Sequence, residues 1–324
     1  MKSIRNQLRN NRIVVLVYRF MYRVIATLFW NIVFIIDKLF HSKVVYGNCF
    51  VFTTPFGKLK KNNWGDDLNY YLFNSIITDK IRFVPFDKLF FAPKVEKYSL
   101  IGSIIGDFNL DSTIVYGSGA ITSYPVIKGV PKKVNSVRGP LTREVLLRNG
   151  IECPEVYGDP ALLVTKVYKP TIQKQDRIGI IPHYRTLETN WEENAWFTEL
   201  SKRHEILVID MSEYVNWTDI IDSICSCKYV FSESLHGLII AEAYSVPSIW
   251  VEIQKHDMPW QWDFKFNDFY ASINKPYTGS LKLYEADNVE SMMNMVKDWK
   301  PGSIDYDAII KAIPFELKRG IFDE

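Results

Sequence analysis

The chain has 324 residues, 47% hydrophobic, 15% aromatic and 23% charged, so it is long enough to bury one or two sizeable cores. Its formal net charge of +2 gives no sign of a nucleic-acid partner, and none is expected. The four cysteines show no paired Cys-x-x-Cys spacing, and the single Cys225-x-Cys227 pair is too little for zinc. We therefore expect no dedicated metal cluster, and cysteine usage typical of a reducing cytoplasm.

The first 40 residues differ from the rest in charge and hydropathy. They hold seven basic residues and one acidic residue, whereas the remainder holds 32 basic and 36 acidic residues. Residues 13–36 are mostly apolar, but Arg19 and Arg23 interrupt them, which leaves an uncharged run at 24–36. As a helix that run spans roughly 20 Å, less than the roughly 30 Å hydrocarbon core of a bilayer. The pattern favours a basic amphipathic helix lying on a membrane surface. The alternatives are a helix packed on the protein's own core, an oligomer contact, or a true span or signal.

From residue 41 onward, short β-rich runs alternate with helical patterns. The β-rich runs are residues 44–52, 99–105, 113–116, 177–181, 205–209, 229–231 and 247–251. The helical patterns are residues 66–78, 140–149, 191–202, 216–225 and 236–244. Strand–helix alternation of this kind predicts an α/β fold with parallel sheets and helices on both faces.

A polar stretch that contains Pro170 divides this alternating region near residues 166–176. We therefore expect two doubly wound, Rossmann-like domains, and two amphipathic helices near the C-terminus at 289–299 and 303–318. The predicted units are the basic helix in 1–40, an N-terminal domain in 41–167, a C-terminal domain in 173–275, and C-terminal helices in 276–324 that pack back.

Ligands of such sheets bind beyond the carboxyl ends of the strands, so the strand-to-helix junctions are the places to search. At residues 62–69, Gly65 permits a tight turn and Asp66 could cap the helix that follows. The functional interpretation is a polar loop over a ligand, in which Asp66 or Asn69 binds a hydroxyl. At a second junction Ser118 lies between two glycines directly after a strand, where the backbone can approach a ligand closely.

A third junction carries two arginines. Pro140 is favourable at the first position of a helix, and Arg138 comes just before it. The helix dipole disfavours a cation there, so Arg138 is expected to form an anion site with the helix amides. Arg143, three residues into the helix, is either a second anion ligand or an ordinary ion-paired arginine.

The fourth junction places His236 near the start of a helix, directly after the apolar run 229–231. A lone histidine is usually structural. Here, however, Ser234 lies beside it, Gly237 allows close approach, and the helix dipole lowers the imidazole pKa. The position favours a functional role.

Together these segments resemble the polysaccharide pyruvyltransferases, and most closely the bacterial exopolysaccharide and capsule enzymes of that family. The matching segments follow one another in the expected order between residues 63 and 270, and the first 40 residues lie outside them. They are Asn63-Trp-Gly-Asp-Asp-Leu-Asn69, Tyr116-Gly-Ser-Gly119, Val137-Arg-Gly-Pro-Leu-Thr-Arg143, Tyr157-Gly-Asp-Pro-Ala-Leu162, Ser234-Leu-His-Gly237, Ala241-Glu-Ala-Tyr-Ser-Val-Pro247 and Lys265-Phe-Asn-Asp-Phe-Tyr270.

The resemblance implies a glycosyltransferase-B-like pair of domains with a cleft between them. It implies phosphoenolpyruvate as the donor, no cofactor, and a product in which a pyruvate ketal bridges two hydroxyls of one sugar while phosphate is released. The acceptor implied is a sugar on a polyprenyl-diphosphate lipid of capsule or exopolysaccharide biosynthesis. The expected location is therefore the cytoplasm, peripherally on the inner face of the cell membrane, with a homo-oligomer left open.

This chemistry assigns expected roles to the junction residues. Guanidinium and ammonium groups would bind the donor's carboxylate and phosphate, with Arg138 first, then Arg143 and Lys265. His236 would act as the general acid or as a phosphate ligand, and Asp66 would orient or deprotonate an acceptor hydroxyl. The remaining expected substrate contacts are Asn63, Asn69, Ser118, Ser234 and Leu235.

Two other functions stay open from the sequence. One is a nucleotide-sugar-dependent glycosyltransferase on the same scaffold, and the other is a non-catalytic scaffold for capsule assembly. The indoles of Trp260 and Trp262 could stack on a sugar or cover the core.

Overall fold

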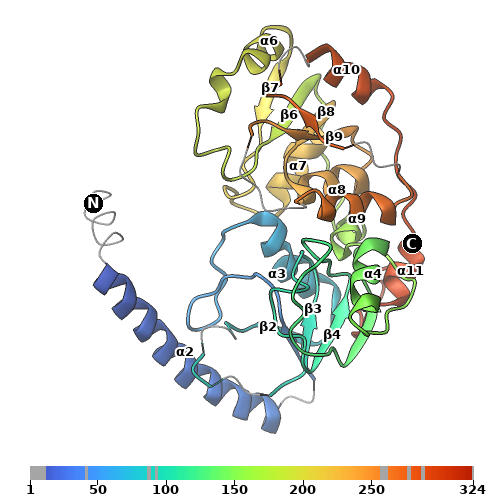
Figure 1. The fold of residues 1–324 in the computed structure, drawn as a ribbon. Helices are drawn as coiled ribbons and strands as arrows, with labels where there is room; N and C mark the ends of the chain where they lie inside the picture. The colour runs from blue at the N-terminus through green and yellow to red at the C-terminus, as the bar shows by residue number, and fades with distance from the viewer. Residues whose placement is uncertain are drawn as a thin grey trace.

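Two five-stranded parallel sheets organise the chain, one in each half (Figure 1). The computed structural model of the chain describes residues 12–40, 43–85, 89–91, 94–255, 262–275, 279–285 and 289–322. The predicted α/β class with Rossmann-like parallel sheets is confirmed.

The first sheet has the strand order β2-β1-β3-β4-β5, with every neighbouring pair parallel. Its strands are β1 (Val44–Gly47), β2 (Lys80–Phe83), β3 (Lys97–Ser99), β4 (Thr113–Tyr116) and β5 (Lys133–Ser136). Its helices are α3 (Trp64–Ile76), α4 (Pro140–Arg148), the 3-10 helix η2 (Pro160–Leu163) and α5 (Val164–Val167). The sequence predicted β4 correctly, made β1 too long, placed β3 too late and missed β2 and β5.

The second sheet has the order β10-β9-β8-β6-β7, again parallel throughout. Its strands are β6 (Arg177–Ile181), β7 (Glu205–Val208), β8 (Tyr229–Ser232), β9 (Ser248–Glu252) and β10 (Leu281–Lys282). Its helices are η3 (Trp191–Glu193), α6 (Ala195–Arg203), α7 (Thr218–Ser226), α8 (Leu235–Ala243), α9 (Phe264–Ser272) and α10 (Val289–Lys297). Apart from α9 and β10, these elements lie within a few residues of the predicted ones.

The two halves share one apolar core. Leu68 and Leu72 of α3 belong to the same buried cluster as Leu238 and Ile239 of α8. Figure 1 shows α3, α8 and α9 between the two sheets. Because side chains from both halves fill this layer, the residues at the facing helix ends are held in fixed positions.

The chain returns to the first half at its C-terminal end. Helix α11 (Tyr306–Lys311) packs there, and its Ile309 carbonyl accepts a hydrogen bond from the Tyr116 hydroxyl at 3.0 Å. The helix predicted at 303–318 is therefore confined to six residues, and Leu317 instead forms an antiparallel bridge with Ile77.

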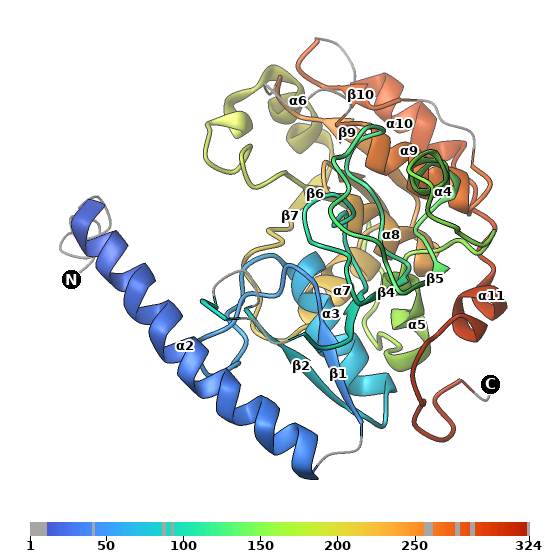
Figure 2. The same cartoon turned by 60° about the horizontal axis from the view of Figure 1, so that its bottom comes forward.

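The N-terminal helix α2 (Arg12–Phe40) lies along the outside of the first half (Figure 2). Its second half packs on the sheet through buried Trp30 and through Asp37, which accepts two 2.7 Å hydrogen bonds from Arg82. The Tyr46 hydroxyl donates a third, at 2.9 Å. By length and composition α2 could also cross a membrane, a test that core helices and signal sequences pass too. The contacts of its second half make it part of the folded body.

Candidate active site

A cleft of about 650 Å³ opens between the carboxyl edges of the two sheets. This is the position at which α/β sheets bind ligands, because loops and helix N-termini gather there. Both halves contribute polar side chains to it. The sequence-predicted residues that line it are Asn63 and Asp66 from the first half and Ser234, Leu235, His236 and Lys265 from the second.

The first turns of α3 and α8 meet at the cleft. Asn63 caps α3 by accepting a 3.0 Å hydrogen bond from the Gly65 amide, and Ser234 caps α8 through the Gly237 amide. A Cβ atom on Gly65 would lie 1.9 Å from Nδ1 of His236, so the imidazole packs directly on the Gly65 backbone. The prediction that Asp66 caps the helix is wrong, because helix α3 begins two residues earlier and Asp66 lies in its first turn.

His236 is uncharged at neutral pH. Burial, together with the positive charges of Lys265 and Arg138, lowers the pKa of the imidazole to about 3. Its Nε2 atom is buried and has no hydrogen-bond partner among the described residues. An unpaired buried nitrogen of this kind is costly, and a ligand oxygen that reached it would remove the cost.

Asp66 and Lys265 both have pKa values displaced toward neutrality. The pKa of the Asp66 carboxyl is raised to about 7 by burial and by the charge of Asp67, against the opposing charge of Lys265. The pKa of the Lys265 ammonium is lowered to about 7 by burial and by the charge of Arg138, against the opposing charge of Asp66. A cleft that holds an acid and a base near pH 7 can move protons under physiological conditions.

The Lys265 ammonium rests on aromatic rings. Its nitrogen lies 3.7 Å from the ring centroid of Trp262 and 5.0 Å from that of Phe266. No ion pair within 4.0 Å joins it to a carboxylate in the described parts of the chain. Trp262 lines the cleft, and its ring centroid lies 5.2 Å from that of His183 in an edge-on arrangement. The indole of Trp262 therefore holds the Lys265 ammonium at the wall of the cleft. Trp260 lies outside the residues that the structure describes.

Arg138 does not line the cleft. Its guanidinium is fully buried, and its Nε donates to Oδ2 of Asp268 at 3.0 Å. It also donates to the Ala120 carbonyl at 2.6 Å and to the Ser103 hydroxyl. The guanidinium thus has protein partners in this structure, and its direct contact with the donor stays a prediction. Its charge still lowers the pKa of both His236 and Lys265 from beneath the cleft.

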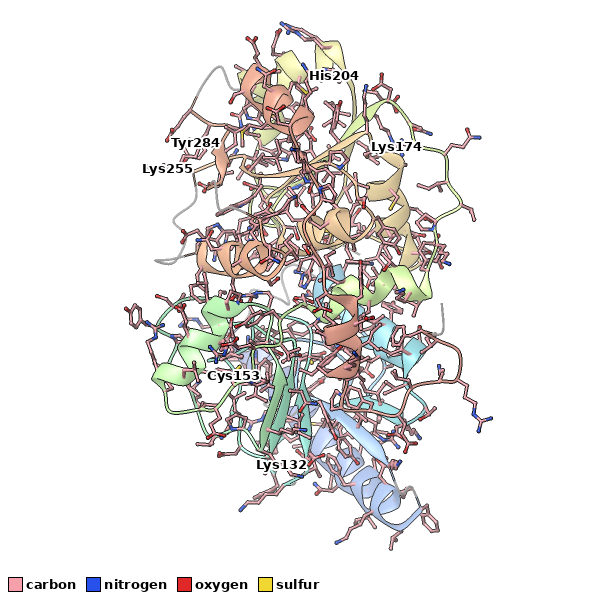
Figure 3. All side chains as sticks on the ribbon, turned by 90° about the vertical axis from the view of Figure 1, so that its right-hand side faces the viewer. Lys132, Cys153, Lys174, His204, Lys255 and Tyr284 are labelled. Atoms are coloured by element: carbon pink, nitrogen blue, oxygen red, sulfur yellow. The ribbon has the colours of Figure 1, made fainter. Side chains whose placement is uncertain are left out.

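Three further predicted contacts lie outside the cleft. The Nε of Arg143 donates to the Cys153 carbonyl at 3.0 Å, and the guanidinium pairs with exposed Glu155 at 3.2 Å. Figure 3 labels Cys153 beside α4, away from the layer between the sheets. The buried Asn69 amide holds the backbone of Ile101, and the buried Ser118 hydroxyl donates to the Leu100 carbonyl. These three side chains contact other protein groups and are not among the residues that line the cleft.

Sequence reasoning missed several residues that build the site. Glu233, at the end of β8, accepts hydrogen bonds from the amides of His183 and Ile253 and from the Thr186 hydroxyl. This carboxylate joins loops from three strands, and Arg185 on one of those loops lines the cleft. The sequence feature that could have identified Glu233 is its position between two serines at the end of a buried strand.

Two buried carboxylates beneath the cleft were also missed. Asp268 accepts from Arg138 and from both the amide and the hydroxyl of Thr142. Asp159 caps η2 through the Ala161 amide at 2.9 Å, and burial raises its own pKa to about 6. Its charge contributes to the raised pKa of Asp66.

The groups that line the cleft are chemically suited to proton transfer and anion binding. In the described ranges, no group of three or more His, Cys, Asp or Glu residues is arranged to hold a metal ion. What the site does contain is a neutral imidazole, a carboxyl and an amine that titrate near pH 7, and the N-terminal turns of two helices.

Comparison with known proteins agrees with this geometry. The family model for polysaccharide pyruvyl transferases matches residues 112–255, which run from β4 to the end of β9 and include Arg138 and His236. A similar protein, an uncharacterized protein of Acanthamoeba polyphaga mimivirus, is 27% identical over 245 residues, which cover 71% of this chain and 75% of that protein. The match over residues 112–255 supports membership of the polysaccharide pyruvyl transferase family, and with it an enzyme, a pyruvyltransferase.

Proposed function

We propose that the enzyme transfers pyruvate from phosphoenolpyruvate to two hydroxyls of one sugar, forming a cyclic ketal and releasing phosphate. The observation that carries this proposal is the meeting of Asp66, His236 and Lys265 in one cleft between the two halves, each built on a parallel five-stranded sheet. The donor needs an anion site and a proton source in the same place, and these three residues offer both.

The donor's negative charges would lie against Lys265 and the first turn of α8. Lys265 offers a cation held by Trp262 rather than by a carboxylate, and Arg138 adds positive potential from below. The amides of Leu235 and His236 are in the first turn, where the helix provides no intrahelical acceptor. Neutral His236 would then bind a donor oxygen as a hydrogen-bonding group instead of serving as the acid.

Asp66 is the proton source in this scheme. Its protonated carboxyl gives a proton to the methylene carbon of the donor, and the first sugar hydroxyl bonds to the adjacent carbon. The proton of that hydroxyl returns to the Asp66 carboxylate. The bond between the same carbon and the phosphate oxygen then breaks, the second hydroxyl closes the ketal ring, and its proton leaves with the phosphate as hydrogen phosphate. Bound donor charge would raise the Asp66 pKa further and keep the acid protonated.

We further propose that the acceptor is a polyprenyl-diphosphate-linked sugar of capsule or exopolysaccharide biosynthesis, used at the cytoplasmic membrane surface. The support is helix α2, whose outward face carries exposed Leu28, Ile32, Ile35 and Leu39 in one stripe. Such a stripe is expected of a helix that lies in the headgroup region of a bilayer.

The test is phosphate release from phosphoenolpyruvate with and without lipid-linked, galactose-containing acceptors. We expect acceptor-dependent release from wild type and a loss of about 10²–10⁴-fold in Asp66→Asn and His236→Ala. Arg143→Ala is the control, because its side chain lies outside the cleft, and it should stay within about twofold of wild type. No release with any acceptor, together with binding of nucleotide sugars by calorimetry, would replace this proposal with a nucleotide-sugar glycosyltransferase.

A further inference from the structure

A second hollow, of about 770 Å³, lies between the first half of α2 and the carboxyl edge of β1 and β2. We call it the α2 groove. Its walls are largely apolar and aromatic, and they include Leu16, Phe20, Val51, Phe52, Phe90 and Phe108. Buried Trp30 and the contact of Asp37 with Arg82 hold the second half of α2 against the sheet. The first half stands away from the sheet, and the α2 groove lies between the two (Figure 2).

The charged residues that line the α2 groove are all basic in the described part of the chain. They are Arg19, Arg23 and Lys60. Two of the cations lie over aromatic rings, which hold them at the wall. The Arg23 guanidinium is 4.3 Å from the ring centroid of Phe90, and the Lys60 nitrogen is 5.6 Å from that of Tyr22. An apolar hollow with fixed cations is complementary to an amphiphile with an anionic head.

The groove and the catalytic cleft share a wall. Phe50 lines both hollows and packs edge-on against Phe108 at 4.8 Å, while the neighbouring Asp107 lines the cleft. Cys49, in the groove, lies close enough to Asp66 that the carboxylate contributes to the raised pKa of the thiol. A molecule whose head lay near Phe50 could therefore place an attached group beside Asp66.

We propose that the α2 groove binds the prenyl-diphosphate portion of the acceptor. The prenyl chain lies along the aromatic wall of α2, the two phosphates meet Arg19, Arg23 and Lys60, and the attached sugar passes Phe50 into the cleft. This inference rests on the proposed function, since it gives the lipid-linked acceptor a site. It also gives the two faces of α2 different functions. The inner face binds the prenyl chain of the acceptor, and the outer face contacts the bilayer.

The first experiment measures binding of farnesyl diphosphate, a short water-soluble prenyl diphosphate, to the full chain by calorimetry. Wild type should bind it, and Arg19→Glu and Arg23→Glu should each weaken binding at least about tenfold through charge reversal. Arg12→Glu makes the same charge change on the same helix but outside the groove, and it should leave the affinity unchanged. A Phe52→Asp variant should also lose binding, whereas Phe56→Asp, on the same loop but outside the groove, should retain it.

Several outcomes would overturn the assignment. These are no binding by wild type, equal weakening by Arg12→Glu, equal affinity for inorganic pyrophosphate alone, or phosphatidylglycerol vesicles that remove the heat of farnesyl diphosphate binding as effectively as prior saturation with farnesyl diphosphate does. The proposed function is tested separately with a water-soluble sugar acceptor. If phosphate release requires that acceptor but Arg23→Glu uses the lipid-linked acceptor as well as wild type does, the groove assignment alone fails. If no acceptor supports release, the function fails whatever the groove binds.

Discussion

At the scale of single residues, burial decides which group can give a proton. The imidazole of His236, with its pKa lowered to about 3, carries almost no proton at pH 7. The Asp66 carboxyl, with its pKa raised to about 7, is about half protonated there. The sequence predicted both residues at strand-to-helix junctions and favoured His236 as the acid. The pKa values of the two groups in the folded chain favour Asp66 instead.

This reversal predicts the direction of the pH dependence. Because the proposed acid is the protonated form of Asp66, kcat/KM should fall as the pH rises through about 7, the pKa of this carboxyl in the free enzyme. The corresponding fall in kcat, the alkaline limb of its pH profile, should occur at higher pH, since the negative charge of the bound donor raises the Asp66 pKa. Initial rates of phosphate release between pH 5.5 and 9, at roughly half-unit steps, measure both limbs.

Lys265 also loses its charge near pH 7, so a second variant must separate the two groups. Lys265→Arg keeps a positive charge across this range, because guanidinium groups do not titrate there. The limb in kcat/KM should therefore persist in Lys265→Arg if Asp66 causes it. Its disappearance in that variant would assign the limb to Lys265 and remove Asp66 as the acid.

At the scale of elements, the site depends on how closely two helix ends approach each other. Helices α3 and α8 come from different sheets, yet Gly65 of one contacts the His236 ring of the other. Glycine is required at this point because any Cβ atom would occupy the position of the imidazole. The glycine thus has a packing reason in addition to the turn for which the sequence suggested it.

A Gly65→Ala substitution should therefore separate activity from stability. The new methyl group would displace the His236 ring, and a misplacement of about 1 Å can cost about 10²-fold in rate. Alanine is also the better helix former by up to about 1 kcal/mol, so the melting temperature should not fall sharply. Asn74→Ala, exposed near the other end of α3, is the matched control for both measurements. Near-normal phosphate release by Gly65→Ala would contradict the proposed role of the imidazole position.

The elements also show where sequence reasoning reached its limit. The missed strands β2 and β5 form the two edges of the first sheet, and each is a four-residue strand that begins with an exposed lysine. Short polar edge strands protect sheets from unwanted pairing, and for that reason they lack the apolar pattern that marks inner strands. The contact between Arg138 and Asp268 was not predictable for a different reason, because the two residues are 130 positions apart and only the fold brings them together.

At the scale of the whole molecule, α2 gives the enzyme an apolar side. The helix is 29 residues long, roughly 43 Å, and its outer residues are exposed along that length. Deleting the helix would also uncover the sheet beneath Trp30 and remove the partner of Arg82. Substitutions confined to the outer stripe test its function while leaving those contacts in place.

We expect serine at Leu28, Ile32, Ile35 and Leu39 together to weaken binding to anionic vesicles by about tenfold or more, because the buried apolar area provides much of the attachment energy. Flotation with vesicles of phosphatidylglycerol and phosphatidylcholine measures this, and added salt should weaken wild-type binding because the basic side chains of α2 lose their attraction to the lipid. The control replaces exposed Val126, Val130 and Val215, which lie outside α2, by serine and should bind as wild type does. If wild type does not float but sediments as a dimer that the α2 variant dissociates, the stripe is an interface between two copies. The outer face would then meet protein, and the lipid-linked acceptor would have to reach the α2 groove past that partner.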